Sequence, residues 1–145
     1  GDSESVNAAL LEARRILDPP VATSADAVMT IEGEVTRKID VWKMLCVCTT
    51  VIDVEAHTSE CANRVGRVVE EAITNAVRHG GASSVEINVV GATGSVRVTV
   101  TDDGSGPARG NPGLGSAILD HATEGNWALE AGPIGAVLTA TVSNN

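Results

Sequence analysis

A chain of 145 residues, with 43% hydrophobic and 20% charged residues, has the length and composition of one globular domain. It contains two Trp and no Tyr or Phe, so its core must be built from Val, Ile, Leu and Ala, and a surface that stacks nucleic-acid bases on aromatic rings is nearly excluded. The net charge of −9 repels a phosphate backbone, so we expect no nucleic-acid partner. A small anion can still bind where backbone N–H groups or a metal ion supply positive potential.

The three cysteines are odd in number, and Cys46 and Cys48 stand too close in sequence to pair easily. No second Cys/His pair at a zinc-like spacing accompanies them, so we expect Cys46, Cys48 and Cys61 to be buried and reduced, which fits a cytoplasmic location. No apolar run reaches the roughly 18 residues of a membrane span, so we expect no membrane contact by this segment. The chain begins with Gly1, as an excised piece would, which leaves a membrane anchor in the parent protein open.

Residues 5–17 are predicted to form a helix, because their apolar positions follow the helical period: Val6, Ala9, Leu10, Ala13 and Leu17. Asp18-Pro19-Pro20 ends this helix, since proline lacks the backbone N–H that a helix requires. We therefore expect residues 1–20 to be an N-terminal helix and linker, followed by one domain at residues 21–145.

Residues 27–31 are predicted to form a strand, and a second strand is expected around residues 45–54. The stretch 32–55 as a whole has no clear period. It remains open from the sequence whether this stretch is a structural insertion or a docking surface.

A long helix is predicted from Thr58 or Ser59 to His79, with Gly80-Gly81 as its end. Its apolar positions fit the helical period: Cys61, Val65, Val68, Val69, Ala72, Ile73, Ala76 and Val77. Glu71, Asn75 and His79 recur every four residues, and Arg78 lies seven residues after Glu71. These four polar side chains therefore share one side of the helix, next to the apolar stripe.

The second half of the chain is predicted to contain two hairpins around a short helix. Alternating apolar residues within 85–100 flank a turn at 91–94, and residues 127–142 turn at Gly132-Pro133-Ile134-Gly135. The helix is expected at about 114–122. Helices and antiparallel strands in separate runs predict an α+β fold, a two-layer sandwich.

Two glycine-rich loops are candidate ligand sites. Asp102-Asp103-Gly104-Ser105-Gly106 follows a valine strand directly, and it reads either as a tight turn or as backbone that approaches a ligand beside an acceptor carboxylate. Gly113-Leu114-Gly115-Ser116 opens a helix, whose free N–H groups form a phosphate seat. The second loop is neither a P-loop nor a dinucleotide fingerprint, since Ile118 occupies the place of the third glycine.

Taken in order, these elements resemble the ATP-binding fold shared by gyrase, Hsp90, MutL and the histidine kinases. Glu-Ala-x-x-Asn-Ala-x-x-His resembles the N box, Asp-x-Gly-x-Gly the first glycine box, and Gly-Leu-Gly the second. The resemblance covers residues 58–142. It implies a Bergerat-type sandwich with a mixed, mostly antiparallel sheet and helices on one face, and ATP and Mg²⁺ as cofactors.

On the base side, the resemblance implies that Asp102 accepts a hydrogen bond from the adenine amino group. Gly104 and Gly106 would pass under the base. Asp103 is expected to be a solvated turn residue. The closing strand has Gly135-Ala136 where the family often has Gly-Thr, so a polar contact near Asp102 is expected to be missing.

On the phosphate side, the resemblance implies that Asn75 is a Mg²⁺ ligand, as suits an amide oxygen. Arg78 and His79 would contact phosphate, with a structural helix-end role for His79 left open. The phosphate seat would comprise four residues: Gly113, Leu114, Gly115 and Ser116. Residues 108–112 are shorter than a full ATP lid, so an open pocket of modest affinity is expected.

Glu71 matches the glutamate that activates water in hydrolysing members, and it is the candidate catalytic residue. In a kinase it would orient the acceptor, hold the water shell of the metal, or do little.

The leading hypothesis is the catalytic domain of a two-component sensor histidine kinase. Its partners would be ATP or ADP, a histidine on a separate dimerisation helix of the parent kinase, and indirectly a response regulator. His57, His79 and His121 do not resemble an acceptor motif, so the acceptor is expected outside this chain. The alternatives are an anti-sigma-factor serine kinase and a nucleotide-binding scaffold without transfer activity. A gyrase-like ATPase is disfavoured, because the transducer lysine is absent.

Overall fold

The structure, a computed structural model, describes residues 29–106 and 114–144. Its elements, in chain order, are α1 (Ile31–Trp42), β1 (Val47–Asp53), α2 (Ser59–Thr74), the π-helical turn η3 (Asn75–His79), β2 (Ser84–Ala92), β3 (Ser95–Asp102), α3 (Leu114–Thr123), β4 (Trp127–Ala131) and β5 (Ala136–Ser143). The helix predicted at residues 5–17 lies outside the described residues, as does the short loop at 108–112. No helix among the described residues is long and apolar enough to cross a membrane.

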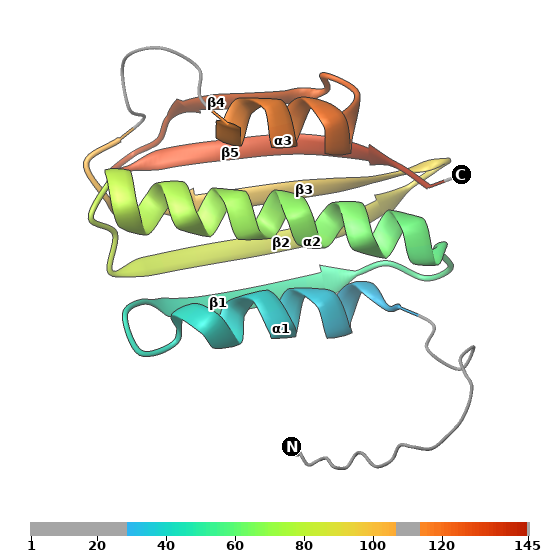
Figure 1. Cartoon of the computed structure of the whole chain (residues 1–145), viewed down its shortest axis with the longest axis horizontal. Coiled ribbons are helices and arrows are strands. Elements are labelled where there is room, and N and C mark those ends of the chain that lie inside the picture. Colours follow the sequence, from blue (N-terminus) through green and yellow to red (C-terminus); the bar gives the residue numbers. More distant parts are fainter. Residues whose placement is uncertain (1–28, 107–113, 145) are drawn as a thin grey trace.

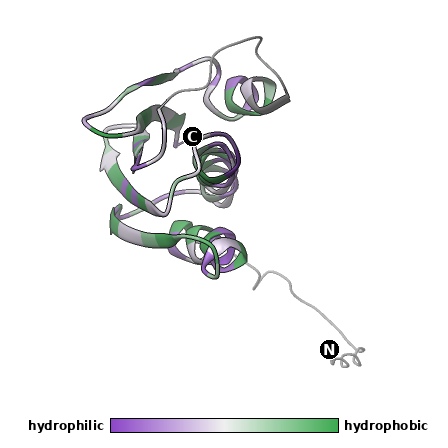
Figure 2. Cartoon of the chain, turned by 90° about the vertical axis from the view of Figure 1, so that its left-hand side faces the viewer, coloured by the Kyte–Doolittle hydropathy of each residue, from purple (hydrophilic) through white to green (hydrophobic). Residues whose placement is uncertain are grey.

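All the strands of the described residues belong to one five-stranded sheet, in the order β1-β2-β3-β5-β4. Only the β1–β2 pair is parallel. The three α-helices lie side by side over one face of this sheet (Figure 1), and the view from the end shows the two layers (Figure 2). The expected α+β sandwich with a mixed, mostly antiparallel sheet is therefore confirmed.

The core is made of small aliphatic side chains between the two layers. Three valines of β3 (Val96, Val98 and Val100) and three apolar residues of β2 (Val85, Ile87 and Val89) are buried against the apolar stripe of α2. Both Trp residues are only partly buried and pack at the edge of the core. The core without aromatic rings follows from the composition, as predicted.

The cysteines also match the prediction. Cys46 and Cys61 are buried, Cys48 is half-buried, and all three are free. Among the described residues no group of three or more His, Cys, Asp or Glu side chains is placed to hold a metal ion.

The strand predicted at residues 27–31 is wrong at its described end, because Ile31 begins helix α1. Thr30 caps this helix, with its hydroxyl accepting a hydrogen bond from the Gly33 N–H at 3.0 Å. The His57 Nε2 atom accepts a second one from the Ile31 N–H at 3.1 Å. These contacts satisfy two N–H groups that a helix start leaves unpaired, and Ile31 and Val35 are buried against the rest of the domain. The second predicted strand is confirmed as β1.

The long helix predicted to end at His79 is confirmed, with a local difference in its last turn. Thr58 caps its start by accepting from the Cys61 N–H. Its last five residues form the π-helical turn η3, in which the Gly80 N–H donates to the Asn75 carbonyl at 3.2 Å. Gly81, at φ +64°, then turns the chain out of the helix. Both predicted hairpins and the helix near residue 114 are present.

Candidate functional site

The Asp102 carboxylate is fixed at the end of β3. Asp102 pairs with the buried Val85, so its side chain points to the helical side of the sheet. Its Oδ1 atom accepts hydrogen bonds from the Gly104 N–H at 2.8 Å and the Ala136 N–H at 3.2 Å. Among the hydrogen bonds of the described residues, none uses Oδ2. The half-buried carboxylate is therefore held by its own backbone surroundings with one oxygen left to accept from a ligand.

Close backbone packing holds the loop that carries Asp102. The Ser105 N–H donates to the Gly80 carbonyl at 2.8 Å. A Cβ atom at Gly104 would stand 2.6 Å from that carbonyl oxygen, which no side chain can tolerate without a backbone shift. Gly104 was predicted to pass under a base, and here its lack of a side chain also allows the loop to pack on the end of η3.

Gly135 closes the site from the β4–β5 turn. A Cβ atom there would overlap the Asp102 Oδ1 and carbonyl oxygen, and it would lie 2.6 Å from the Gly104 nitrogen. The adjacent Ala136 supplies the backbone N–H that binds Oδ1. Ala136 therefore makes the backbone hydrogen bond to Asp102, but it lacks the side-chain hydroxyl that a threonine would have at this position. The sequence indicated Gly80 only as a helix end, and it did not indicate the contact between Gly135 and Asp102.

Asp103 is exposed, as predicted, but its carboxylate is anchored. It accepts hydrogen bonds from the Ser83 hydroxyl and N–H, both at 2.9 Å, and from the Ser84 N–H at 3.0 Å. The hydrogen bonds from the Ser83 hydroxyl and from the Ser84 and Ser83 backbones hold the pKa of Asp103 below its usual value. Asp103 thus joins the end of β3 to the start of β2.

The polar side of the α2–η3 helix ends beside this loop. Glu71 and Asn75 are half-buried, and Arg78 and His79 are exposed. Burial raises the pKa of Glu71, the neighbouring Glu70 raises it further, and His79 lowers it. The contact between Gly80 and Ser105 brings this helix end to the Asp102 loop, so the structure brings both groups of predicted residues to one end of the molecule (Figure 1).

The second glycine loop is only partly described. Gly106, at φ +102°, adopts a conformation that favours glycine. Gly113 lies outside the described residues, whereas Leu114, Gly115 and Ser116 form the first turn of α3. This turn carries backbone N–H groups without an intrahelical partner, as every helix start does.

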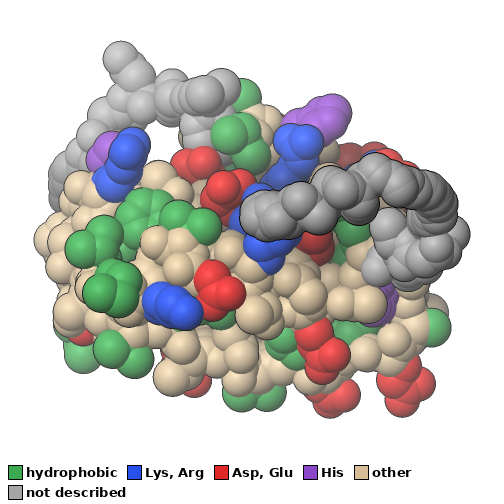
Figure 3. Space-filling view, turned by 60° about the horizontal axis from the view of Figure 1, so that its bottom comes forward, with side chains coloured by type: hydrophobic (Ala, Val, Ile, Leu, Met, Phe, Trp, Pro, Cys, Tyr) green, Lys and Arg blue, Asp and Glu red, His purple; other side chains and the backbone are tan. Residues whose placement is uncertain are grey.

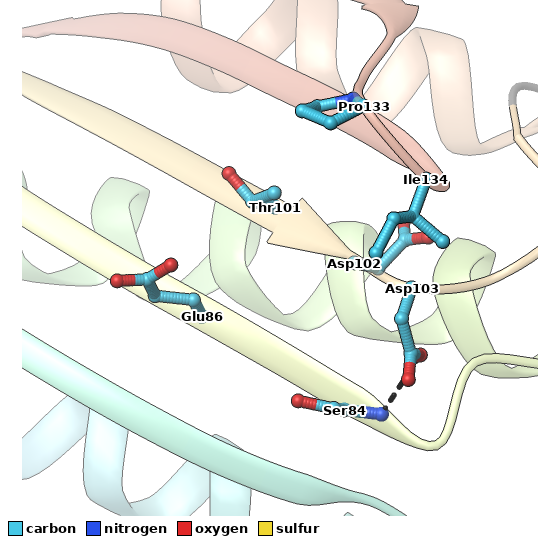
Figure 4. Close-up of a pocket in the computed structure, with 7 residues that line it drawn as sticks. All are labelled: Ser84, Glu86, Thr101, Asp102, Asp103, Pro133 and Ile134. Carbon is cyan, nitrogen blue, oxygen red and sulfur yellow. Dashed lines mark hydrogen bonds between the residues drawn. The ribbon is translucent and has the colours of Figure 1, made fainter.

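A shallow cavity of about 160 Å³ lies on the other face of the sheet. Ser84, Glu86 and Thr101 alternate with buried residues of β2 and β3, so their side chains point away from the helices, which appear behind the sheet in Figure 4. The lining residues are Ser84, Glu86, Thr101, Asp102, Asp103, Pro133 and Ile134. Among the described residues that line this cavity, none comes from α2 or η3, and only Asp102 belongs to the predicted site.

The arrangement matches known proteins at the level of family and fold. The sequence profile of the histidine kinase-like ATPase domain matches residues 37–130, more than half of the chain. The sensor histidine kinase LnrJ of Bacillus subtilis (strain 168) is 43% identical over 56 residues, which are 37% of this chain and 13% of that protein.

Among solved structures, the ATP binding domain of PrrB from Mycobacterium tuberculosis superposes with a TM-score of 0.64 and 24% identity, over 82% of this chain and 97% of that one. The histidine kinase domain of the Erythrobacter litoralis EL346 blue-light activated histidine kinase gives 0.62 and 21%, over 79% and 60%. At these identities the superpositions establish the fold, while the sequence profile establishes the relationship. The chain therefore belongs to the histidine kinase-like ATPase domain family.

Proposed function

We propose that this chain is the ATP-binding catalytic domain of a sensor histidine kinase. It binds ATP or ADP with Mg²⁺ and supplies the γ-phosphoryl group to a histidine on a separate dimerisation helix of the parent kinase. The phosphoryl group then passes to a response regulator. In this proposal residues 21–145 form the catalytic domain, residues 1–20 connect it to the acceptor helix, and the domain works in the cytoplasm. The observation that carries the proposal is the fixed Asp102 carboxylate, whose Oδ2 atom accepts no hydrogen bond from the described residues.

Base recognition follows from the geometry of Asp102. A carboxylate oxygen accepts from the amino group of adenine, whereas guanine presents a carbonyl oxygen at the corresponding position. Oδ1 is held by the Gly104 and Ala136 N–H groups, so the carboxylate cannot rotate away without losing both bonds. An unpaired acceptor in a half-buried site is costly, and this cost discriminates against guanine nucleotides.

The phosphates and the metal are proposed to lie along the polar side of α2 and η3. The Asn75 amide oxygen is a suitable Mg²⁺ ligand, and Mg²⁺ offsets phosphate charge when bound. Arg78 and His79 lie on the same turn and would contact the phosphates. Gly113 through Ser116, at the start of α3, would direct backbone N–H groups at them.

Glu71 is the proposed catalytic residue, one helical turn before Asn75. Its raised pKa reflects a partly desolvated carboxyl group, as befits a residue that handles a proton or holds a water molecule. Two roles are distinguishable: orienting the acceptor side chain, or holding the water shell of the metal. Loss of transfer with unchanged nucleotide affinity in Glu71→Gln favours the first role, and a weaker Mg²⁺-dependent affinity favours the second.

Calorimetric titration with Mg·ADP, Mg·ATP and Mg·GDP tests the site. We expect the unchanged chain to bind Mg·ADP and Mg·ATP. Asp102→Asn should lose most or all of this affinity. Asp53→Asn, at the exposed end of β1, is the matched control and should bind as the unchanged chain does. Equal affinity for Mg·GDP, or full affinity in Asp102→Asn, would contradict the proposal.

The acceptor is tested in the intact parent protein with labelled ATP. Phosphohistidine is acid-labile and phosphoserine is acid-stable, so the stability of the label separates a histidine kinase from an anti-sigma-factor serine kinase. Nucleotide binding without any labelled partner would favour a nucleotide-binding scaffold without transfer activity. Ala136 and the short 108–112 loop are the two sequence features that suggest this alternative.

A further inference from the structure

The carboxylate of Asp103 receives three hydrogen bonds from the segment that leads into β2. Its Oδ1 atom accepts from the Ser83 N–H at 2.9 Å and from the Ser84 N–H at 3.0 Å, and Figure 4 shows the second of these bonds. Its Oδ2 atom accepts from the Ser83 hydroxyl at 2.9 Å. We call Asp103, Ser83 and Ser84 the β2–β3 clamp. Both oxygen atoms of this exposed side chain are therefore held by donors of the protein itself.

Backbone hydrogen bonds extend the clamp across three strands. The Asp103 N–H donates to the Ser84 carbonyl at 3.2 Å, and the Val47 N–H donates to the Ser83 carbonyl at 2.9 Å. The ladder between β2 and β3 ends at Asp102, so the clamp begins where the ladder stops. It therefore ties β1, β2 and β3 together at the end of the sheet that carries the Asp102 carboxylate.

We propose that Asp103 is a positioning residue for base recognition, an inference that rests on the proposed role of Asp102. Gly104 follows Asp103 directly, and its N–H donates to the Asp102 Oδ1 atom at 2.8 Å. The clamp fixes the residue that lies between this donor and this acceptor, so it restricts rotation of the peptide group that carries the N–H. Without the clamp, the Ala136 N–H would be the one fixed donor left to Oδ1. Asp103 thus acts on the nucleotide through Asp102.

The competing role for Asp103 is that of an ordinary surface charge. The chain has a net charge of −9, and acidic and basic side chains are interspersed on the side of the molecule shown in Figure 3. One more exposed carboxylate on such a surface would only weaken the attraction of an anionic nucleotide. In that case every neutral replacement of Asp103 would have the same effect on affinity, whether or not it keeps the hydrogen bonds.

Two neutral variants separate these roles. Asp103→Asn removes the charge but can keep all three contacts, because the amide oxygen accepts from both N–H groups and the amide nitrogen donates to the Ser83 hydroxyl oxygen. Asp103→Ala removes the same charge together with all three contacts. Glu86→Ala is the matched control, since it removes another exposed carboxylate from β2.

Calorimetric titration with Mg·ADP measures the consequence for binding. We expect Asp103→Asn and Glu86→Ala to keep a Kd close to that of the unchanged chain. Asp103→Ala should weaken binding by about tenfold, the lower end of what one charge-assisted hydrogen bond contributes. Ser83→Ala should weaken it less, because both N–H donors remain, and it should add nothing in the Asp103→Ala background. Equal affinities for Asp103→Asn and Asp103→Ala would overturn the inference.

Amide hydrogen exchange tests the clamp without a nucleotide. In Asp103→Ala we expect faster exchange at Gly104 and Ala136, whose N–H groups bind Asp102, and unchanged exchange at Val98 in the middle of β3. Asp103→Asn should leave all three rates unchanged. Exchange at Gly104 that is as slow in Asp103→Ala as in the unchanged chain would overturn the inference. An unchanged chain that binds no Mg·ADP would instead refute the proposed function, and the exchange rates would then test the clamp on their own.

Discussion

Replacing Gly135 by alanine tests whether close backbone packing fixes the Asp102 carboxylate. The added methyl group would overlap two oxygen atoms of Asp102 and lie 2.6 Å from the Gly104 nitrogen. Two of these three contacts are with backbone atoms, so rotation of a side chain cannot relieve them. Either the β4–β5 turn or the loop after β3 must move, and in both cases the hydrogen bond from Ala136 to Oδ1 is strained or broken.

The size of the effect can be estimated from two costs. Overpacking of this kind destabilises a protein by about 1–3 kcal/mol. Each kcal/mol lowers the Tm by roughly 4 °C in a domain of this size. In the proposed complex, displacement of the carboxylate would remove a charge-assisted hydrogen bond to the nucleotide, which contributes about 1.5–3 kcal/mol. That loss corresponds to a roughly 10- to 150-fold weaker Kd.

Thermal unfolding and calorimetric titration with Mg·ADP measure both effects on the same samples. Gly91→Ala is the matched control, because a Cβ atom there meets its nearest neighbour at an ordinary 3.6 Å. We expect Gly91→Ala to remain close to the unchanged chain in both measurements. If Gly135→Ala keeps the Tm and the Kd of the control, the carboxylate is not held by this packing and the reasoning fails.

Three further predictions address the helix side of the site and the core. Glu71→Gln should raise the Tm more at pH 7 than at pH 4. Folding raises the pKa of Glu71, so the ionised carboxylate lowers the stability of the fold at pH values above the pKa that Glu71 has in the unfolded chain. Equal Tm shifts at the two pH values would contradict this. Asn75→Ala should remove the gain in nucleotide affinity that Mg²⁺ provides, measured by titration with and without the metal; a gain of the same size in the variant would exclude Asn75 as a ligand. Burial, with a smaller contribution from Cys48, raises the pKa of Cys46 to about 11, so a disulfide reagent at neutral pH should modify this thiol quickly only in denaturant, and rapid reaction in the native chain would refute the burial.

Local periodicity predicted most of the fold, and the exception at α1 shows its limit. The strand at residues 27–31 was predicted from the local strand propensity of these residues. Two hydrogen bonds at residues 31–33 instead favour the start of helix α1. One is the Thr30 cap, which is visible in the sequence three residues before Gly33. The other is the bond from the Ile31 N–H to His57, which lies 26 residues away. A contact at that separation forms only in the folded chain, so no local pattern could predict it.

The candidate site divides in the same way. The polar stripe from Glu71 to His79 was predictable, because side chains four residues apart share a helix face. The π-helical turn, the bond from Ser105 to Gly80 and the contact between Gly135 and Asp102 join segments that are far apart in sequence. The glycines were visible, but what each approaches depends on the packing of three separate segments. The placement of Gly113 and the 108–112 loop remains a prediction.

The two sides of the proposed site face different electrostatic demands. A chain of net charge −9 repels a nucleotide at long range, and the polar side of α2 and η3 carries Arg78 and His79 together with Glu70 and Glu71. The two glutamates outnumber the arginine, so the side chains of this helix supply no net positive charge against a triphosphate. In the proposal, the metal at Asn75 and the N–H groups of α3 must supply it. In the proposal, recognition of the base depends on the Asp102 Oδ2 atom, and the Oδ1 atom of the same carboxylate is fixed by two backbone N–H groups. In the proposed complex, the backbone contacts that fix Asp102 would lie on the base side, where geometry would decide specificity. The exposed Arg78 and His79 would lie on the phosphate side, where the acceptor would enter.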